Sequence, residues 1–305
     1  MDVLRLDHVV KRFGEFTAVD DLSFAVAPGE VFGFLGGNGA GKTTSLRMAL
    51  DILRPDSGTI SILGRAPGRA NSGGLGFLPE ERGLYRSMSA IDTIVYFGRL
   101  KGMVAGDARR EGLVLLERFG LADFAKTSVD KLSKGMAQKV QLATAVVNAP
   151  KLLILDEPFS GLDPVNQGLL EEEILRASKA GAAVVFSTHV MQHAERLCDR
   201  LLLLARGRKL FEGTQDAARA TLPVRLSLVA RQSPAGLEGV ASASDAGVAE
   251  GEWRAWDVQL SPGVSPGDLL ERCTGQGFAL RRFEQHRPSL HDVFLHIVGG
   301  AEARP

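Results

Sequence analysis

The sequence predicts an α/β fold in which helices cover a mostly parallel sheet, with a helical block inserted into it and a small α+β domain after it. An apolar run at residues 31–35 leads directly into a glycine-rich turn and the start of a helix. Beyond residue 150, apolar runs again alternate with helical segments. Because this βαβ order joins parallel strands through crossover helices, a parallel sheet is the expected core.

Length and charge limit the classes of protein before any motif is considered. With 305 residues, the chain is long enough for two domains, predicted at residues 1–215 and 224–305 with a linker at 213–223. Hydrophobic residues make up 45% of the chain, which is ordinary for a globular protein. Lysine plus arginine and aspartate plus glutamate both number 36, so net charge does not indicate a nucleic-acid partner.

The lack of a membrane-spanning run or a secretory signal, together with the cysteine usage, predicts a cytoplasmic protein. No apolar run approaches the roughly 20 residues needed to span a bilayer, and the charged N-terminus is unlike a secretory signal. Cys198 and Cys273 fall in different predicted domains, without the cysteine and histidine neighbours of a metal site. Two reduced thiols are therefore expected.

The first 80 residues are expected to form mainly strands around one helix. Apolar and polar residues alternate at 22–26, as in a half-buried strand, whereas 31–35 is typical of a fully buried one. After the first helix, short strands are predicted at 59–63 and 75–78, with a loop at 65–74 between them.

The helical block is predicted at about residues 85–148. Ser89 is placed to cap its first helix, and Asp107 to cap a second that ends at Gly120. A third helix follows Gly135. A helical block within a strand-rich chain indicates an inserted subdomain.

Strand–helix alternation then resumes. Buried strands are predicted at residues 151–155, 182–186 and 200–204, separated by helices at 164–180 and 190–198.

The last 80 residues are expected to be a small α+β appendage. Alternation at 256–260 predicts a strand, and helices are predicted near 266–274 and after a cap at Ser289. The Ala, Ser, Gly and Glu composition of residues 242–252 predicts a flexible loop.

The most specific motif is GGNGAGKTT at residues 36–44, which fits the phosphate-binding pattern G-x-x-x-x-G-K-[ST]. Backbone N–H groups must approach a triphosphate closely, which side chains in the loop would prevent. The helix that follows directs its positive end at the phosphates, where Lys42 can reach β- and γ-phosphate oxygens and Thr43 can ligate Mg²⁺. The alternative, an ordinary glycine-rich turn, does not account for Lys42 and Thr43 in register. The loop residues expected to contact the nucleotide are Gly36, Asn38, Gly39, Ala40, Gly41, Lys42, Thr43 and Thr44.

A second motif, KLLILDEP at residues 151–158, ends a buried strand in two adjacent acids. Both carboxylates are expected at the carboxyl edge of the sheet, where α/β sheets bind ligands. Asp156 is suited to hold Mg²⁺ with its water, and Glu157 to orient and deprotonate the attacking water. Alone, the motif is equally consistent with a strand that ends in solvated charges.

With these motifs in place, the chain resembles the nucleotide-binding subunits of ATP-binding cassette (ABC) transporters over residues 1 to about 215. LSKGM at 132–136 is similar to the family signature, usually LSGGQ, and SGLD at 160–163 to the loop after the catalytic acid. His189 matches the switch histidine, and Phe13 the aromatic ring that stacks on adenine. The resemblance implies a P-loop NTPase fold with N-terminal antiparallel strands beside the mostly parallel core sheet.

The resemblance also implies roles in a head-to-tail dimer, in which the signature of one cassette closes over the ATP of the other. Ser133 and Gly135 would then contact the γ-phosphate in trans, with Asp163 among the nucleotide-binding residues. Lys42, Glu157 and His189 would be catalytic.

Three of these residues have simpler interpretations. Phe13 could be an ordinary core residue, and Ser133 an ordinary helix cap. His189 and His193 are four apart on a predicted helix and could bind a metal, although Val190 stands where the zinc-protease pattern needs glutamate.

The sequence departs from the family pattern at three places. Gly37 replaces a common proline, and Lys134 and Met136 alter the signature. Glu80 stands where the family usually has the glutamine that touches Mg²⁺ or water and faces the transmembrane partner. A carboxylate can still ligate Mg²⁺ but adds a negative charge near the γ-phosphate. The hypothesis is that Glu80 is a metal-side residue that tunes coupling.

The predicted function is an ATPase subunit that dimerises around Mg-ATP and drives a separate membrane permease from the cytoplasmic face. RPSLHDVF at 287–294 resembles the drug-, sodium- and polysaccharide-exporting branch, which predicts efflux. A homodimer is expected and a heterodimer left open. The alternatives are a soluble ABC-type ATPase acting on ribosomes or DNA, disfavoured by one cassette with zero net charge, and a small-molecule kinase, disfavoured by the signature.

Overall fold

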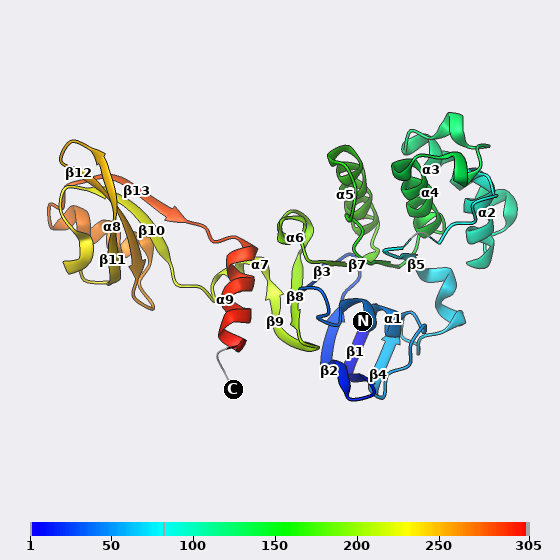
Figure 1. Cartoon of the computed structure of the whole chain (residues 1–305), viewed down its shortest axis with the longest axis horizontal. Helices are drawn as coiled ribbons and strands as arrows, with labels where there is room; N and C mark the ends of the chain where they lie inside the picture. The colour runs from blue at the N-terminus through cyan, green and yellow to red at the C-terminus, as the bar shows by residue number, and fades with distance from the viewer. Residues whose placement is uncertain (1, 82, 303–305) are drawn as a thin grey trace. The chain divides into compact units, whose positions relative to one another are not determined.

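The structure, a computed structural model, describes residues 2–81 and 83–302 and divides into two compact units, Met1–Gln215 and Asp216–Pro305. The outermost residues of the two predicted domains, Met1 and 303–305, lie outside the described residues. Residues 213–223, predicted as a linker, include the helix α7 (Gln215–Arg219). Figure 1 shows the elements in chain order, coloured from blue to red.

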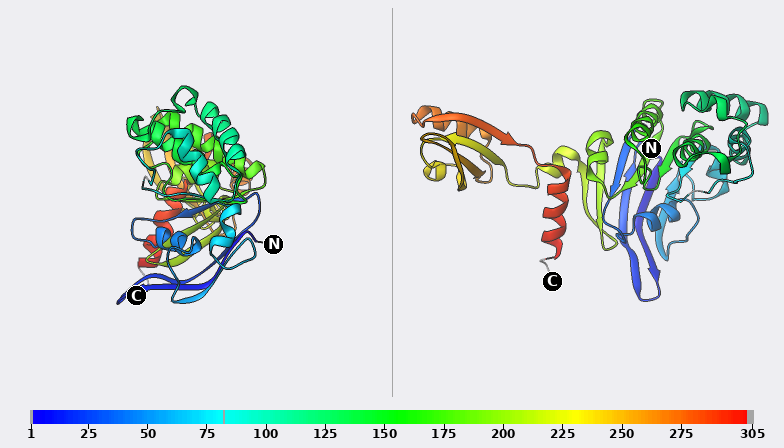
Figure 2. Two further views of the ribbon diagram at one scale, coloured as in Figure 1. Left: turned by 90° about the vertical axis from the view of Figure 1, so that its right-hand side faces the viewer. Right: turned by 45° about the horizontal axis from the view of Figure 1, so that its top comes forward.

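The N-terminal strands form a three-stranded antiparallel sheet, as the resemblance implied. Strand β1 (Leu4–Phe13) pairs on one side with β2 (Phe16–Val26) and on the other with β4 (Ser57–Ile62). The right-hand view of Figure 2 shows β1 and β2 running together as one long hairpin. Phe24 of β2 stacks on Phe32, with the ring centroids 5.3 Å apart. The apolar alternation that predicted a half-buried strand at 22–26 is therefore explained by packing against the core sheet.

The core sheet has six strands in the order β5-β6-β7-β3-β8-β9, of which the first five are parallel. Strand β9 is antiparallel to β8. The prediction of a mostly parallel sheet is confirmed. The helices of βαβ crossovers cover both faces of such a sheet, which is why its strands are continuous apolar runs in the sequence. The bounds are β3 (Val31–Leu35), β5 (Leu75–Leu78), β6 (Leu152–Leu155), β7 (Ala183–Thr188), β8 (Arg200–Ala205) and β9 (Arg208–Thr214).

The strand order brings the predicted motifs together. Strands β6, β7 and β3 are neighbours, and all three run in the same direction. Their carboxyl ends therefore lie side by side at one edge of the sheet, which is where α/β sheets bind ligands. The phosphate loop follows β3, the two acids follow β6, and His189 follows β7.

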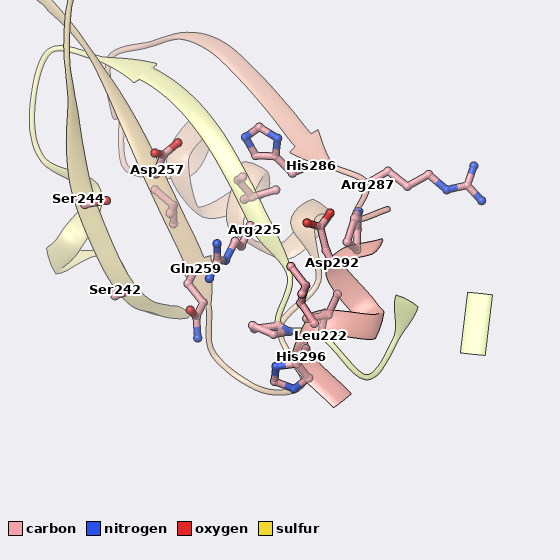
Figure 3. A pocket seen from close by; sticks show the side chains of 15 residues that line it. Leu222, Arg225, Ser242, Ser244, Asp257, Gln259, His286, Arg287, Asp292 and His296 are labelled. Carbon is pink, nitrogen blue, oxygen red and sulfur yellow. The ribbon is translucent and has the colours of Figure 1, made fainter. Parts of the chain in front are cut away.

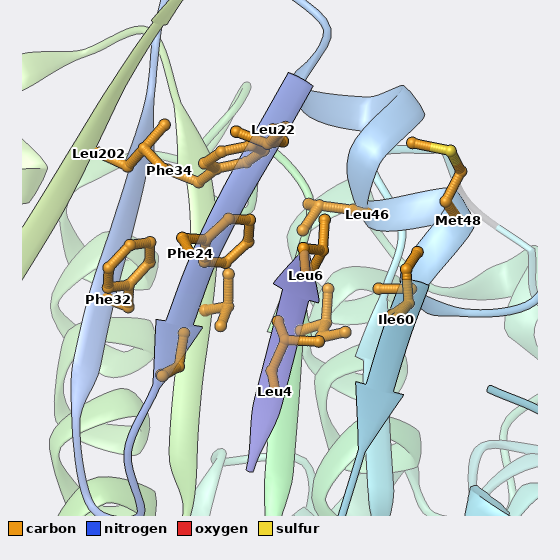
Figure 4. Close-up of a cluster of buried hydrophobic side chains, with 14 of the residues drawn as sticks. Leu4, Leu6, Leu22, Phe24, Phe32, Phe34, Leu46, Met48, Ile60 and Leu202 are labelled. Atoms are coloured by element: carbon orange, nitrogen blue, oxygen red, sulfur yellow. The ribbon is translucent and has the colours of Figure 1, made fainter. Parts of the chain in front are cut away.

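Helices cover the two faces of the core sheet. Helix α1 (Lys42–Ala49) contacts β2 and β4, so it lies between the two sheets, whereas α5 (Pro164–Lys179) and α6 (Met191–Leu197) contact β3 and β7. Figure 4 shows the apolar core on the side of α1, where Leu46 and Met48 meet side chains from both sheets. A short 3₁₀ helix (Arg69–Gly74) occupies part of the predicted loop at 65–74.

The helical block contains α2 (Ala90–Leu100), α3 (Ala105–Arg118) and α4 (Lys134–Val146), with 3₁₀ turns at Ala122–Phe124 and Val129–Lys131. Ser89 caps α2 as predicted, since its hydroxyl accepts a hydrogen bond from the N–H of Asp92. The prediction for Asp107 was wrong: Val104 is the N-cap of α3, and Asp107 lies in the first turn. An acid in the first turn still interacts favourably with the helix dipole. An acidic residue near the start of a helix is therefore equally typical of the N-cap and of the first turn.

The second unit is a four-stranded antiparallel sheet in the order β11-β12-β10-β13. Its strands are β10 (Arg225–Ala230), β11 (Val240–Glu250), β12 (Trp253–Leu260) and β13 (Leu280–His286), with helices α8 (Pro266–Gly275) and α9 (Leu290–Glu302) and a 3₁₀ turn (Pro234–Gly236). Helix α8 contributes Leu269 and Cys273 to the apolar core of this unit.

The predicted flexible loop at 242–252 was wrong, because β11 occupies most of it and pairs with β12. Small residues have weak strand propensity, so the hydrogen bonds to the neighbouring strand determine that this segment forms a strand. Both cysteines are free and buried, Cys198 in the first unit and Cys273 in the second. Within the described part of the chain, no helix is both long and apolar enough to cross a bilayer.

Candidate functional site

A pocket of about 490 Å³ lies where the carboxyl ends of β3, β5, β6 and β7 meet the turn between β1 and β2. It collects side chains that are far apart in the sequence and that were predicted separately. The predicted residues lining it are Phe13, Asn38, Gly39, Ala40, Gly41, Lys42, Thr43, Thr44, Glu80, Glu157 and His189.

The glycine-rich loop is packed against protein on one side and open on the other. A Cβ on Gly36 would lie 2.3 Å from the carbonyl oxygen of Leu204, and one on Gly41 2.4 Å from that of Ala18. Gly41 also has a φ of +105° and Gly39 one of +75°. A Cβ on Gly37 or Gly39 would meet nothing within 4 Å. The fold thus requires glycine at 36 and 41, and an open concave face of backbone remains to wrap a phosphate.

Lys42 is buried and held by oxygen atoms. Its Nζ donates hydrogen bonds to the carbonyl oxygens of Gly36 (2.8 Å) and Gly37 (3.2 Å). The same Nζ lies 3.2 Å from Oε1 of Glu157, and only 6% of the Lys42 side chain is exposed. The ammonium group is therefore poised over the loop, between the loop and the acid.

Asp156 lies directly behind the pocket, beside Thr43. Oδ1 of Asp156 accepts hydrogen bonds from Oγ1 of Thr43 (3.2 Å) and Oγ of Ser187 (2.6 Å). A carboxylate and a hydroxyl side by side are hard oxygen donors of the kind that Mg²⁺ prefers. The residues present thus fit a magnesium ion at this position.

Glu157 joins the pocket from the end of β6. Its Oε2 lies 3.0 Å from Nδ1 of His189, and 10% of its side chain is exposed. The backbone of Glu157 has a φ of +44°, an unusual value for a residue with a side chain. The carboxylate is thus nearly buried, flanked by a lysine and a histidine, and directed to the side of the pocket where a phosphate would lie.

The structure separates the two histidines that were considered as a metal pair. Helix α6 begins at Met191, so His189 precedes it instead of lying on it. The His193 ring stacks on Phe159, with centroids 3.9 Å apart, and its Nδ1 lies 3.0 Å from Nη2 of Arg196. Burial, and then the charge of Arg196, lower the pKa of His193. Among the described residues, no cluster of three or more histidine, cysteine or acidic side chains could hold a metal ion.

Ser133, Gly135 and Asp163 do not line this pocket. Ser133 caps α4, accepting a hydrogen bond from the N–H of Met136, and is exposed. Asp163 caps α5 by accepting from the N–H of Asn166 (2.9 Å), and this hydrogen bond lowers the pKa of its carboxyl. Gly135 lies close to the same Asn166, since a Cβ on it would be 2.9 Å from Nδ2.

Reasoning from sequence missed four residues of the site. One is Gly37 of the phosphate loop, which lines the pocket but was not among the residues expected to contact the nucleotide. Phe16 and Ala18 line the pocket, and Phe16 pairs with Phe13 across the hairpin turn. Phe13 and Phe16 are 49% and 62% exposed, so the interpretation of Phe13 as a core residue is wrong. Ser187, the fourth, directly follows the predicted strand at 182–186, and the structure extends that strand, β7, through it to Thr188.

The second unit has a pocket of its own, of about 850 Å³, on the face of its sheet opposite α8. Figure 3 shows side chains from β10, β12 and α9 gathered around it, among them Arg225, Gln259 and His296. Asp257 and His286 also line it. No motif predicted this pocket, because its residues come from five separate elements.

Comparison with known proteins matches both units. The family described as "ABC transporter" matches residues 19–160, and "ATP-binding protein DrrA1-3-like, C-terminal domain" matches residues 222–298. The ABC transporter ATP-binding protein YhaQ of Bacillus subtilis (strain 168) is 40% identical over 302 residues, covering 97% of this chain and 99% of that protein.

One further relative and one solved structure are also similar to this chain. The Nod factor export ATP-binding protein I of Burkholderia orbicola (strain AU 1054) is 37% identical over 306 residues, 98% of each chain. A solved structure titled "Structure of ATP binding subunit of ABC transporter" is 30% identical, with a TM-score of 0.68, covering 72% of this chain and 92% of that one.

Proposed function

The chain belongs to the ATP-binding subunits of ABC transporters, a family that hydrolyses ATP to power transport, and from this premise we propose how its residues act and with what they assemble. Two copies of the chain close around two Mg-ATP and pull on a separate membrane-spanning permease. Closure on binding and reopening after hydrolysis shift the population between two states. The subunit works at the cytoplasmic face of the membrane, where ATP is found.

The observation that carries the proposal is the pocket that brings the loop, Lys42, Glu157 and His189 together. Mg²⁺ would be held by Thr43 and Asp156, with Glu80 at the rim, and would neutralise charge on the phosphates. Phe13 and Phe16 offer exposed rings on the opposite side of the pocket, where an adenine could stack. A triphosphate thus finds a polar end and an aromatic end in one pocket.

Catalysis would rest on positioning and electrostatics. Glu157, nearly buried at the end of β6, takes a proton from the attacking water, and His189 beside it holds the carboxylate in orientation. Lys42 already binds three oxygen atoms, those of Gly36, Gly37 and Glu157. Phosphate oxygens would replace these partners, so Lys42 stabilises the transferred phosphoryl group and leaves Glu157 free to act as the base.

Ser133, Gly135 and Asp163 would complete the site of a second copy. Ser133 is exposed at the N-terminus of α4, a helix of 13 residues whose dipole favours an anion there. Because these residues lie outside the pocket of their own chain, a contact with nucleotide requires a partner. Intact motifs support pairing with an identical copy, and a heterodimer is the other outcome that a test would distinguish.

Export is the proposed direction of transport. It is supported by the relatives named for Nod factor export, and by the linearmycin resistance ATP-binding protein LnrL of Bacillus subtilis (strain 168), 28% identical over 306 residues. The match of residues 222–298 to the DrrA1-3-like C-terminal domain supports the same branch.

The proposal is tested with Glu157→Gln, which keeps the shape of the side chain and removes the base. We expect ATP affinity within about twofold of wild type and turnover reduced about 100-fold or more. Glu172→Gln, at an exposed position of α5, is the matched control and should leave both unchanged. Comparable turnover in Glu157→Gln would assign the base to another residue.

The same variant tests the partners, because it should remain closed around Mg-ATP. Tagged Glu157→Gln protein with Mg-ATP is expected to capture a multi-spanning membrane protein from detergent-solubilised native membranes, and to elute as a dimer. Recovery of ribosomes or DNA alone would contradict the permease and leave the ATPase site standing.

A further inference from the structure

Ser187 is a buried hydroxyl that does not line the pocket but contacts two acids of the proposed active site. It lies in β7, two residues before His189, with no exposed surface. Its Oγ accepts a hydrogen bond from the backbone N–H of Glu157 (2.8 Å) and donates one to Oδ1 of Asp156 (2.6 Å). One hydroxyl group therefore contacts both of the adjacent acids.

The direction of each hydrogen bond follows from the chemistry of the partners. A backbone N–H can only donate, and an ionised carboxylate can only accept. The single proton of the Ser187 hydroxyl must therefore point at Asp156, and a lone pair must face Glu157. Neither role can be exchanged, so the hydroxyl has one orientation.

The contact with Glu157 acts on an unusual backbone. Glu157 has a φ of +44°, in a region that residues with side chains occupy only when the surroundings impose it. The N–H of Glu157 has Ser187 Oγ as the acceptor, while the N–H of Asp156 bonds to the carbonyl oxygen of Leu78 within the sheet. Ser187 thus stabilises the point at which the chain leaves the strand and turns the Glu157 carboxylate towards Lys42 and His189.

The contact with Asp156 acts on the magnesium side of the site. Ser187 and Thr43 both donate to Oδ1 of Asp156, at 2.6 and 3.2 Å. Two donors on one oxygen fix the rotation of the carboxyl group and leave Oδ2 to face elsewhere. Partners of this kind commonly change metal affinity or activity about 10- to 100-fold when they are removed.

We propose that Ser187 is a positioning residue that orients the base, Glu157, and the magnesium-side acid, Asp156, through one hydroxyl. This inference rests on the roles proposed for those two acids. Ser187 touches neither the nucleotide nor the attacking water and acts only through its two neighbours.

The test compares Ser187→Ala with Ser187→Cys in the full-length protein. Alanine removes both hydrogen bonds, and cysteine restores the volume with a much weaker donor and acceptor. Both variants are expected to lose about 10- to 100-fold in kcat. Full recovery of kcat in the cysteine variant would show that Ser187 only fills space, and an unchanged kcat in the alanine variant would also overturn the proposal.

A second measurement is independent of turnover. The dissociation constant of ATP is measured with and without Mg²⁺, and Ser187→Ala should reduce the gain in affinity that Mg²⁺ provides while leaving the Mg²⁺-free value unchanged. A merely structural role would weaken both values together. Ser178→Ala removes a half-buried hydroxyl hydrogen bond to the carbonyl oxygen of Gly29, away from the pocket, and is the control for folding by thermal unfolding.

The final step separates this inference from the proposed function. At saturating Mg²⁺ and ATP, adding Ser187→Ala to Glu157→Gln should lower the residual turnover by far less than it does in wild type, because the base is already absent. An equal factor in both backgrounds would mean that Ser187 does not act through Glu157. If Glu157→Gln alone keeps full turnover, the proposed function fails instead.

Discussion

The pocket at the phosphate loop and the pocket of the second unit differ in how far their charged side chains are buried. The nucleotide pocket, of about 490 Å³, is lined by Lys42 and Glu157, whose side chains are only 6% and 10% exposed. Asp156, which is 4% exposed, contacts the pocket residue Thr43. The pocket of the second unit is larger, at about 850 Å³, yet its Arg225, Asp257 and other charged residues are exposed. Burying a charge costs several kcal/mol unless partners replace the lost water. The smaller pocket, where partners at 2.6–3.2 Å supply that replacement, is therefore the one built for a charged ligand.

Backbone strain shows the same contrast. Among the described residues, each non-glycine residue with positive φ, Glu157 included, lies in the first unit. In the second unit, positive φ occurs at glycines of turns, such as Gly251 and Gly277. Holding a side-chain-bearing residue in this region costs on the order of 1–3 kcal/mol. The first unit thus sustains such strain, and at Glu157 it does so within the site, whereas the second unit confines positive φ to glycine among the described residues.

Removing Lys42 should give the largest effect and tests the contrast between the pockets directly. Lys42→Ala removes a buried ammonium that would bind two phosphates, and hydrogen bonds to charged groups contribute about 1.5–3 kcal/mol each. ATP affinity, measured by calorimetry, is expected to fall about 100-fold or more. Arg225→Ala, which removes a cation from the other pocket, is the matched control and should leave affinity within about twofold. Normal affinity in Lys42→Ala would undo the assignment of the loop.

A glycine pair tests the backbone contrast with a smaller effect. A Cβ on Gly41 would lie 2.4 Å from the carbonyl oxygen of Ala18, at a φ of +105°. Gly277 has a φ of +64° and nothing within 4 Å of such a Cβ. Gly41→Ala should therefore lower the free energy of unfolding by roughly 2–4 kcal/mol and weaken ATP binding, and Gly277→Ala by only about 1 kcal/mol. Urea unfolding measures both, and equal losses would show that φ alone, not packing, requires glycine at 41.

The smallest expected effect is at Glu80, which brings a second acid to the rim of the nucleotide pocket. Glu80→Gln removes a negative charge near the γ-phosphate at an exposed position, so ATP affinity or ATPase rate should change roughly threefold. Steady-state ATPase rates are compared over a range of Mg²⁺ concentrations, with and without the permease. If rate, Mg²⁺ dependence and permease stimulation are all unchanged, Glu80 does not tune coupling.

Much of the fold could be predicted from short-range pattern. The strands at 31–35 and 75–78 and the cap at Ser89 agree with the structure, because period, turn chemistry and capping are encoded by neighbouring residues. The prediction of a loop at 242–252 was wrong, because an edge strand of small residues is stabilised by pairing with its neighbour β12 and not by its own composition. Asp107 was predicted as the N-cap but lies three positions after the actual N-cap, Val104, because an acid suits several places in a first turn.

From the sequence alone, the phosphate loop predicted a nucleotide site, and the acid pair, which by itself is equally consistent with solvated charges, supported that prediction once the loop was recognised. The sequence by itself also determined that the core sheet is parallel. Only the tertiary structure decided that Ser187, 30 and 31 positions away, bonds to Glu157 and Asp156, and that Phe16 shares the pocket with Phe13. The physical reason is that a motif contains only residues that are neighbours in the chain. The order of the strands in the sheet decides which hydroxyl or aromatic ring from a distant part of the chain contacts those residues.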